Sequence, residues 1–408
     1  MAKITPQEAL NRVGSQQGIR LAPTKGKTAR TEFIRALGMD DEIYLFSKGD
    51  GGMILPGDDA LIPILGESDS ADYTQPLPPC LNDWLAEYAD EVNWWQNVGA
   101  GISSQAAAPQ ADAQTAELTE DISPLIRSTW AQQAPYNQNL TIDGKKCLVG
   151  CVPVSIGQVM LFWARKGYTR GCMATPAYIS ATNLSEIPAL PPVTVFDFDA
   201  MTYTKPNTVA AKKAVADLLE HIGMAVRADY TPTGTGAFPA IYTEAMKTIL
   251  RLGANIRIVR CATIGLANFE AAILNDLTEG KPVMMGGYKT TGGGHSFICD
   301  GYRESDKKFH FNWGWGGSYN GYYAMTSLNP TAVNIYNSNK MAIIGIQPDY
   351  KLGDTNGDGK VNVTDAMTIV SAANSGQGTE RTDVNSDGKT NVADVMIVVN
   401  NVLGKNKL

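Results

Sequence analysis

Histidine is scarce in this chain: only His221, His295 and His310 occur among its 408 residues. No second cysteine pair follows Cys147-x-x-x-Cys151 at the spacing that zinc sites use. Because structural zinc sites draw four Cys or His ligands from such pairs, the sequence argues against zinc at these two cysteines. It favours a nucleophile there instead.

Basic runs and long apolar runs are also lacking. Charged residues make up 18% of the chain and the net charge is −7, which disfavours nucleic acid and anionic membranes as partners because both are bound through Lys and Arg. No apolar stretch approaches the length of a transmembrane helix, and Met1–Pro6 lacks the apolar core of a signal peptide. Either the protein is cytosolic, or a signal has been removed and Met1 is not native; the remaining motifs favour the second.

Cysteine is too sparse for a disulfide framework, although its number is even. Most of these side chains are expected to be buried as small apolar residues, and a bond between Cys147 and Cys172 is left open. The six are Cys80, Cys147, Cys151, Cys172, Cys261 and Cys299.

The length favours two or three domains. Residues 1–98 are predicted to form a compact unit, with a helix at 5–12, strands near 42–46 and 52–55, and a closing helix at 81–95. Residues 99–121 are small and polar, so we expect a flexible linker open to proteolysis. No Lys or Arg lies between Lys48 and Arg127, so a trypsin-like protease has no site in this linker.

The third segment, 122–348, has its helices first and its strands second, which predicts an α+β domain. Apolar periodicity marks the helices and short β-rich runs mark the strands. Helices are expected from Cys151 and at 209–224, 242–252 and 266–279, and strands at 283–288, 296–302, 308–313, 321–325 and 342–347.

The tail, 352–404, contains an internal repeat in which each copy leads into an apolar helix, at 366–373 and 395–403. Side-chain oxygens recur at positions 1, 3, 5, 9 and 12 of a loop with glycine at position 6, the pattern of an EF-hand-type calcium loop. The backbone carbonyl at position 7 completes the set. The predicted ligands of two structural Ca²⁺ ions are Asp354, Asn356, Asp358, Lys360, Asn362 and Asp365, and Asp383, Asn385, Asp387, Lys389, Asn391 and Asp394. Asp at position 12, in place of Glu, differs from sensor EF-hands.

Cys151 is the candidate nucleophile. Apolar residues at 152, 156, 159, 160 and 163 fall on one helical face and Pro153 suits a first turn, so Cys151 lies at a helix N-terminus. Free amides and the helix dipole there favour the thiolate. His295 follows three glycines from Gly292 and starts an apolar strand, which makes it the preferred base over His310, expected to be structural.

The motifs around these residues resemble the streptopain family of papain-like cysteine peptidases. They lie at 150–160, 293–302 and 309–317, with further agreement at 130–137 and 222–230. The N-terminal unit is similar to that family's propeptide at 57–66 and 78–85. The resemblance implies a papain-like catalytic domain preceded by an inhibitory α+β propeptide.

The same resemblance implies the role of each site residue. Cys151 is the nucleophile, and His295 is the general base and later the acid. Gln132 donates its side-chain amide to the oxyanion beside the Cys151 amide, and Trp315 shields His295. Asn312 is a candidate for orienting the histidine, and no cofactor takes part in catalysis.

The duplicated tail resembles a type I dockerin, a small helical module. This resemblance implies that calcium folds the module and that it binds a cohesin-type partner, with Val363, Thr364, Val392 and Ala393 near the contact.

Together these features predict a secreted or surface-bound bacterial cysteine endopeptidase, made as a latent zymogen and acting on proteins or peptides through a thiolate–imidazolium pair. Cleavage within 99–121, by the protein itself or by a non-tryptic enzyme, would activate it. One alternative is a catalytically weak or inactive binding protein anchored through the dockerin, and another is an acyl transferase on the same site.

Overall fold

The structure is a computed structural model that describes residues 3–15, 31–37, 42–48, 51–59, 61–68, 85, 88–89, 91–93, 120–289, 293–357, 359–405 and 408. Most of the predicted linker, much of the predicted helix at 81–95, Gly292 and Asp358 lie outside these residues. The described residues form two compact units. One comprises 1–119, 258–275 and 339–342, and the other comprises 120–257, 276–338 and 343–408.

The first unit is built on an antiparallel sheet of four strands in the order β1-β2-β3-β4. Successive side chains of a strand point to opposite faces, and the described side chains on both faces of β2 are buried. Tyr44 and Phe46 pack with Ala9 of helix α1 on one face, while Ile43 and Leu45 pack in a separate cluster. The elements are α1 (Pro6–Ser15), β1 (Thr31–Leu37), β2 (Ile43–Lys48), β3 (Gly51–Pro56) and β4 (Gly66–Ser68).

Later segments of the chain complete this unit. They carry β9 (Arg257–Arg260), α7 (Cys261–Ile264), most of α8 (Leu266–Thr278) and part of β14 (Ser338–Ile344). The Ile62 amide donates to the Thr263 carbonyl at 3.0 Å, and Arg260 Nη1 lies 3.3 Å from Glu91 Oε2. Burial raises the pKa of Glu91 to about 7 against the opposing effect of Arg260. N-terminal residues therefore fold together with segments of the predicted peptidase domain.

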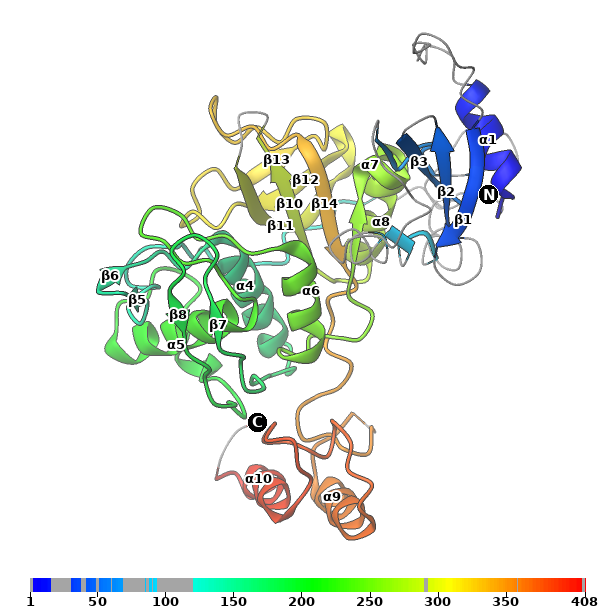
Figure 1. Ribbon diagram of the computed structural model, residues 1–408. Coiled ribbons are helices and arrows are strands. Elements are labelled where there is room, and N and C mark those ends of the chain that lie inside the picture. The colour runs from blue at the N-terminus through cyan, green and yellow to red at the C-terminus, as the bar shows by residue number, and fades with distance from the viewer. Residues whose placement is uncertain are drawn as a thin grey trace. The chain divides into compact units, whose positions relative to one another are not determined.

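The second unit contains the predicted site. Its antiparallel strands follow the order β13-β12-β11-β10, and helices α4, α5 and α6 precede them in the chain (Figure 1). The helices are α4 (Cys151–Arg165), α5 (Val209–Ala225) and α6 (Pro239–Thr248), with short 3-10 turns η2 (Phe198–Ala200) and η3 (Glu304–Asp306). The strands are β5 (Thr141–Ile142), β6 (Lys145–Lys146), β7 (Tyr178–Ile179), β8 (Glu186–Ile187), β10 (Val283–Tyr288), β11 (Gly294–Arg303), β12 (Lys308–Asn312) and β13 (Gly321–Tyr323).

The predicted α+β class is confirmed, with differences at several boundaries. The helix expected at 242–252 is α6, which runs from Pro239 to Thr248. It starts earlier because proline fits the first helical turn. It ends earlier because Arg251 takes a left-handed backbone, with φ of 51°, which an α-helix cannot contain. Strand β9 and helix α7 were not predicted from the sequence.

The tail folds as two capped helices, α9 (Val363–Ser375) and α10 (Val392–Val402). Asn362 and Asn391 are the N-caps, and their side chains accept hydrogen bonds from backbone amides of the first helical turn. The side chains of Asp365 and Asp394 in turn accept hydrogen bonds from the backbone amides of these N-cap residues. Each helix therefore begins three residues earlier than its apolar run, because the cap residues also stabilise its first turn. Within the described residues, no helix is both long and apolar enough to span a bilayer.

The close contact between α4 and α5 depends on Gly157. A Cβ atom at this position would lie 2.7 Å from Leu219 Cδ2 and 3.2 Å from Trp130 Cζ3, and both neighbours are fully buried. The absence of a side chain therefore lets the nucleophile's helix approach α5.

We predict that Gly157→Val lowers the melting temperature, because overpacking a buried contact costs about 1–3 kcal/mol. Differential scanning calorimetry measures the shift. Gly234→Val is the matched control, because nothing lies within 4 Å of a Cβ atom at Gly234. Equal melting temperatures for the two variants would mean that the α4–α5 contact tolerates a side chain.

Candidate active site

Cys151 is the first residue of α4, as its sequence context predicts. Gly150 before it has φ of 96° and supplies no side-chain cap, so the first amides of the helix stay available. The amides of Ser296, Val152 and Cys151 itself face the thiol and lower its pKa. Burial acts in the opposite direction and is the larger effect, so the pKa of Cys151 is raised.

His295 lies near the start of β11, opposite Gly287 of β10. Its Nε2 atom lies 2.8 Å from the backbone carbonyl of Trp313. Because a carbonyl can only accept, this bond requires the hydrogen of the neutral ring on Nε2 and leaves Nδ1 as the proton acceptor. The bond therefore fixes which nitrogen of His295 can act as a base.

Aromatic rings enclose His295, which is 8% exposed. Trp315 stacks on the imidazole with ring centroids 4.8 Å apart and planes 27° apart, so the predicted contact between these two residues is present. Tyr336 lies 5.2 Å away, and Phe297 lies 6.0 Å away. An apolar surround of this kind disfavours a charged imidazole.

Burial disfavours the charged forms of both Cys151 and His295. Burial, the main cause, lowers the pKa of His295 to about 4, and burial raises the pKa of Cys151. No hydrogen bond joins these two described side chains. The thiolate–imidazolium pair expected from the sequence stays a prediction: the amides at the helix N-terminus favour the thiolate, and burial opposes it.

Gln132 is brought beside the nucleophile by its backbone. Its carbonyl accepts a hydrogen bond from the Val149 amide at 3.1 Å, two residues before Cys151. The Gln132 side chain is half-buried, and its part in binding an oxyanion stays a prediction.

Asn312 does not contact His295 in the described structure. Its Nδ2 donates to the Ser128 carbonyl at 2.8 Å, and its Oδ1 accepts the Gly314 amide at 3.1 Å. The suggestion that Asn312 orients the histidine is thus not supported, since the Trp313 carbonyl takes that place. Alternation along the strand explains this outcome, because neighbouring residues point to opposite faces.

The other histidines have structural partners. His310 Nδ1 lies 2.6 Å from Asp300 Oδ1, and the other Asp300 oxygen accepts the Ile126 amide at 2.8 Å. His221 Nδ1 lies 2.8 Å from the Asp217 carbonyl within α5. Cys147 and Cys172 are both free and buried, so the structure contains no disulfide between them.

Sequence reasoning missed Ser296 and Tyr336. Ser296 follows His295 and turns its amide toward the Cys151 thiol, while its hydroxyl lies 3.5 Å from that of Ser155 on α4. Tyr336 is buried, and its pKa is raised to about 12 by burial and then by Cys151. The position of Ser296 beside the histidine was the only signal in the sequence that pointed to either residue.

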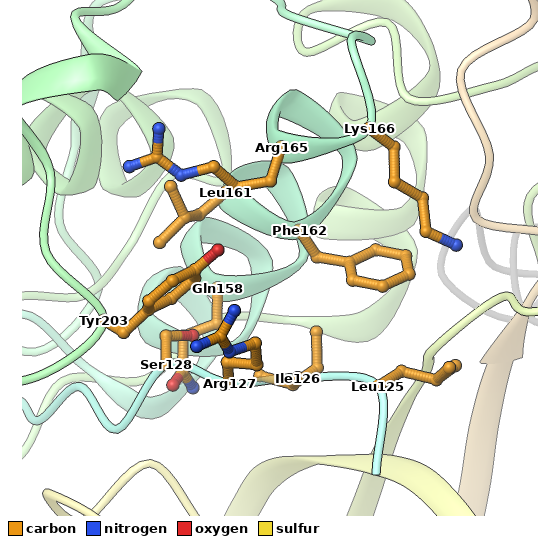
Figure 2. A pocket seen from close by; sticks show the side chains of 10 residues that line it. All are labelled: Leu125, Ile126, Arg127, Ser128, Gln158, Leu161, Phe162, Arg165, Lys166 and Tyr203. Atoms are coloured by element: carbon orange, nitrogen blue, oxygen red, sulfur yellow. The ribbon is translucent and has the colours of Figure 1, made fainter. Parts of the chain in front are cut away.

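A separate hollow of about 180 Å³ lies beside α4, and none of the predicted catalytic residues lines it. Figure 2 shows Tyr203 between Arg127 and Arg165, whose Cζ atoms lie 4.6 Å and 5.7 Å from the tyrosine ring centroid. Lys166 Nζ lies 4.4 Å from the Phe162 ring centroid. These cations already have aromatic partners, and the hollow is not part of the Cys–His site.

The acidic side chains of the second tail loop accept backbone amides of the loop. Asp383 Oδ1 accepts the Asp387 amide at 3.1 Å and Oδ2 accepts the Gly388 amide at 2.9 Å. Asp394 is fully buried and accepts the amides of Asn385 and Asn391 at 3.0 and 2.9 Å. Burial and then, as a smaller effect, the charge of Asp383 raise the pKa of Asp394. A divalent cation would offset both the burial of the Asp394 carboxylate and its repulsion by Asp383, so an oxygen-binding metal such as Ca²⁺ fits this donor set.

The first tail loop follows the same pattern where it is described. Asp354 accepts the amides of Gly357 and Gly359 at 2.9 and 3.0 Å, and Asp365 is fully buried. No three His, Cys, Asp or Glu side chains converge as a metal cluster in the described part of the chain. The predicted ligand sets, which include Asn side chains and the carbonyl of Lys360 or Lys389, stay a prediction.

Comparisons with known proteins agree with this geometry. Residues 130–323 match the peptidase C10 family, and residues 352–403 match the dockerin type I domain. The thiol protease/hemagglutinin PrtT of Porphyromonas gingivalis is 25% identical over 78% of this chain and 39% of its own length, so the chain spans about two fifths of that relative. Streptopain of Streptococcus pyogenes is 23% identical over 75% of this chain and 81% of its own.

The structure of active interpain A, a cysteine protease of Prevotella intermedia, matches with a TM-score of 0.51 and 27% identity. The match covers 56% of this chain and 95% of the interpain A chain. The cysteine at the N-terminus of α4 and the histidine on β11 thus belong to a papain-like cysteine peptidase fold. The chain contains a peptidase C10 (streptopain family) domain followed by a type I dockerin domain.

We predict that the full chain alkylates slowly at Cys151 near neutral pH. Burial raises the pKa of the Cys151 thiol above its usual value and lowers the pKa of His295 to about 4, so both groups favour their neutral forms near pH 7. Reactivity with iodoacetamide should therefore rise as the pH increases above about 8–9. Peptide mass spectrometry distinguishes Cys151 from the other cysteines. Rapid alkylation that is flat between pH 5 and pH 8 would mean that the ion pair already exists.

Proposed function

We propose that this chain is a secreted cysteine endopeptidase made in a latent form, with a calcium-binding docking module at its end. The observation that carries the proposal is that the amide of Ser296, the residue after His295, faces the thiol of Cys151 at the start of α4, while His295 Nε2 lies 2.8 Å from the Trp313 carbonyl. The match to the peptidase C10 family over these residues supports it.

The proposed reaction begins with transfer of the thiol proton of Cys151 to His295 Nδ1. The sulfur attacks the carbonyl carbon of the scissile peptide bond, and the oxyanion accepts hydrogen bonds from the Cys151 amide and the Gln132 side chain. The imidazolium gives its proton to the leaving amine as the C–N bond breaks. Water, deprotonated by His295, then hydrolyses the thioester and restores the thiol.

Latency is supported by two properties of the described residues. Burial shifts the pKa values of Cys151 and His295 toward their neutral forms, and a neutral thiol is a weak nucleophile. Residues 1–119 share their compact unit with 258–275, so the N-terminal segment folds with part of the predicted peptidase domain. We propose that residues 1–98 are an inhibitory propeptide, that 99–121 contain the activation site and that 122–348 form the peptidase domain.

The tail, 352–404, is proposed to bind two Ca²⁺ ions and a cohesin-type partner. When bound, calcium would neutralise the buried carboxylates that each loop brings together. Exposed apolar side chains suit a docking face: Val363 and Met367 on α9 are 63% and 62% exposed, and Val392 and Met396 on α10 are 71% and 50% exposed. Thr364 and Ala393 are the adjacent exposed residues of this face.

We predict that the purified chain, under reducing conditions, cleaves itself between residues 99 and 121. Cys151→Ala should remain full length, and Gln132→Ala should process about 10²–10³-fold more slowly, because one oxyanion donor is lost. Intact mass and N-terminal sequencing follow the reaction. Identical trimming of the parent and Cys151→Ala would show that another protease cuts the linker, and a new terminus after Lys48 or Arg127 would point to a tryptic enzyme.

We also predict that the chain binds two Ca²⁺ ions and loses one with each of two matched substitutions. Asp354→Ala removes position 1 of the first loop and Asp383→Ala removes position 1 of the second. Isothermal titration calorimetry measures the stoichiometry, and far-ultraviolet circular dichroism in chelator measures the loss of helix. Failure of the parent protein to bind calcium would contradict the assignment of the loops.

A further inference from the structure

Arg251, which lies beyond the end of α6, reaches into the second tail loop. The residue is 5% exposed, and its Nη2 donates to the Ser386 hydroxyl. Its Nη1 lies 3.4 Å from the Glu380 carbonyl and 3.5 Å from the Asp383 carbonyl. The guanidinium of the peptidase domain is therefore hydrogen-bonded to the segment that starts the predicted calcium loop.

The two copies of the repeat differ at the residue that Arg251 contacts. The fourth position is Gly357 in the first loop and Ser386 in the second, with φ of 80° and 64°. Glycine adopts this left-handed conformation without a steric penalty, whereas a serine is strained there. Ser386 is 1% exposed, and its hydroxyl accepts the bond from Arg251. The strained residue thus occurs in the copy that the peptidase domain holds.

A stack of side chains extends the same contact. Arg170 and Arg381 lie over the Tyr350 ring, with Cζ atoms 4.8 and 4.6 Å from its centroid. Arg170 Nε also donates to the Arg251 carbonyl at 3.2 Å. Burial lowers the pKa of Arg170 to about 10, which reflects a cation removed from water. Val195 of the peptidase domain packs on the apolar core of the tail.

We propose that Arg251 couples the second calcium loop to the peptidase domain, so that calcium binding in the tail stabilises the peptidase domain. The inference rests on the proposed calcium binding. Ser386 lies between the predicted ligands Asn385 and Asp387, so a bound cation holds its backbone in the conformation that presents the hydroxyl to Arg251. A ligand that binds only the folded loop then stabilises every element that unfolds together with it.

Intrinsic fluorescence can test this coupling, because residues 352–408 contain no tryptophan. All seven tryptophans belong to the rest of the chain, at positions 84, 94, 95, 130, 163, 313 and 315. A calcium-dependent shift in tryptophan-detected melting must therefore be transmitted from the tail.

The experiment compares thermal melting of the full chain in CaCl₂ and in EGTA, with Cys151→Ala as the background to prevent self-cleavage. We expect calcium to raise the melting temperature of the parent, and Ser386→Ala and Arg251→Lys to remove most of that rise. Ser386→Ala leaves every predicted calcium ligand in place. Ser375→Ala is the matched control, since Ser375 is exposed and donates only within α9; it should keep the full rise.

Calorimetric calcium titrations of the same proteins separate the two possible failures. If no protein binds calcium, the calcium role of the tail is wrong and the coupling falls with it. If calcium binds but tryptophan-detected melting does not shift, calcium binding stands and the coupling is wrong. An equal shift in all variants would also overturn the proposal, because the coupling would then not pass through Arg251.

Discussion

The packing of helix α4 against strand β11 is the contact on which the predicted site depends. Cys151 starts the helix, and the amide of Ser296 on the strand faces its thiol. The hydroxyls of Ser155 and Ser296 lie 3.5 Å apart between the same two elements. Since His295 precedes Ser296, the register of this contact places base and nucleophile together. Gly157 supports it from the other side by allowing α5 to approach.

The position of each reactive group could be predicted from the sequence, because those positions depend on local patterns. An apolar helical face beginning after Cys151 indicated a helix N-terminus, and alternating loop oxygens indicated the proposed metal ligands. The partner of His295 could not be predicted in this way. It is the backbone carbonyl of Trp313, and a carbonyl is present in every residue type. Asn312 was suggested because its side chain suits the role, yet it points toward Ser128.

The protonation state shows why a local rule can be outweighed. A helix N-terminus favours a charge by about 0.3–1 kcal/mol at an exposed position. Complete burial can move a pKa by several units, each worth about 1.4 kcal/mol. Cys151, at the N-terminus of α4, experiences both effects, and burial decides the direction of its pKa shift. Burial is also the main cause that lowers the pKa of His295, which lies on a strand. Burial depends on residues such as Tyr336, distant in sequence, so it appears only once the chain is folded.

The repeated tail illustrates how small differences between two copies carry information. The shared residues of the loops are the predicted ligands, and they describe what both copies do. The residues that differ between the copies contact different neighbouring side chains. A Cβ atom at Gly357 would lie 2.6 Å from Arg381 Nη1, so the first loop has no room for a serine there without movement of that arginine. At Ser386 the hydroxyl instead meets Arg251. The left-handed backbone alone would favour glycine in both copies, and the proposed coupling to the peptidase domain gives a reason for the serine in the second copy.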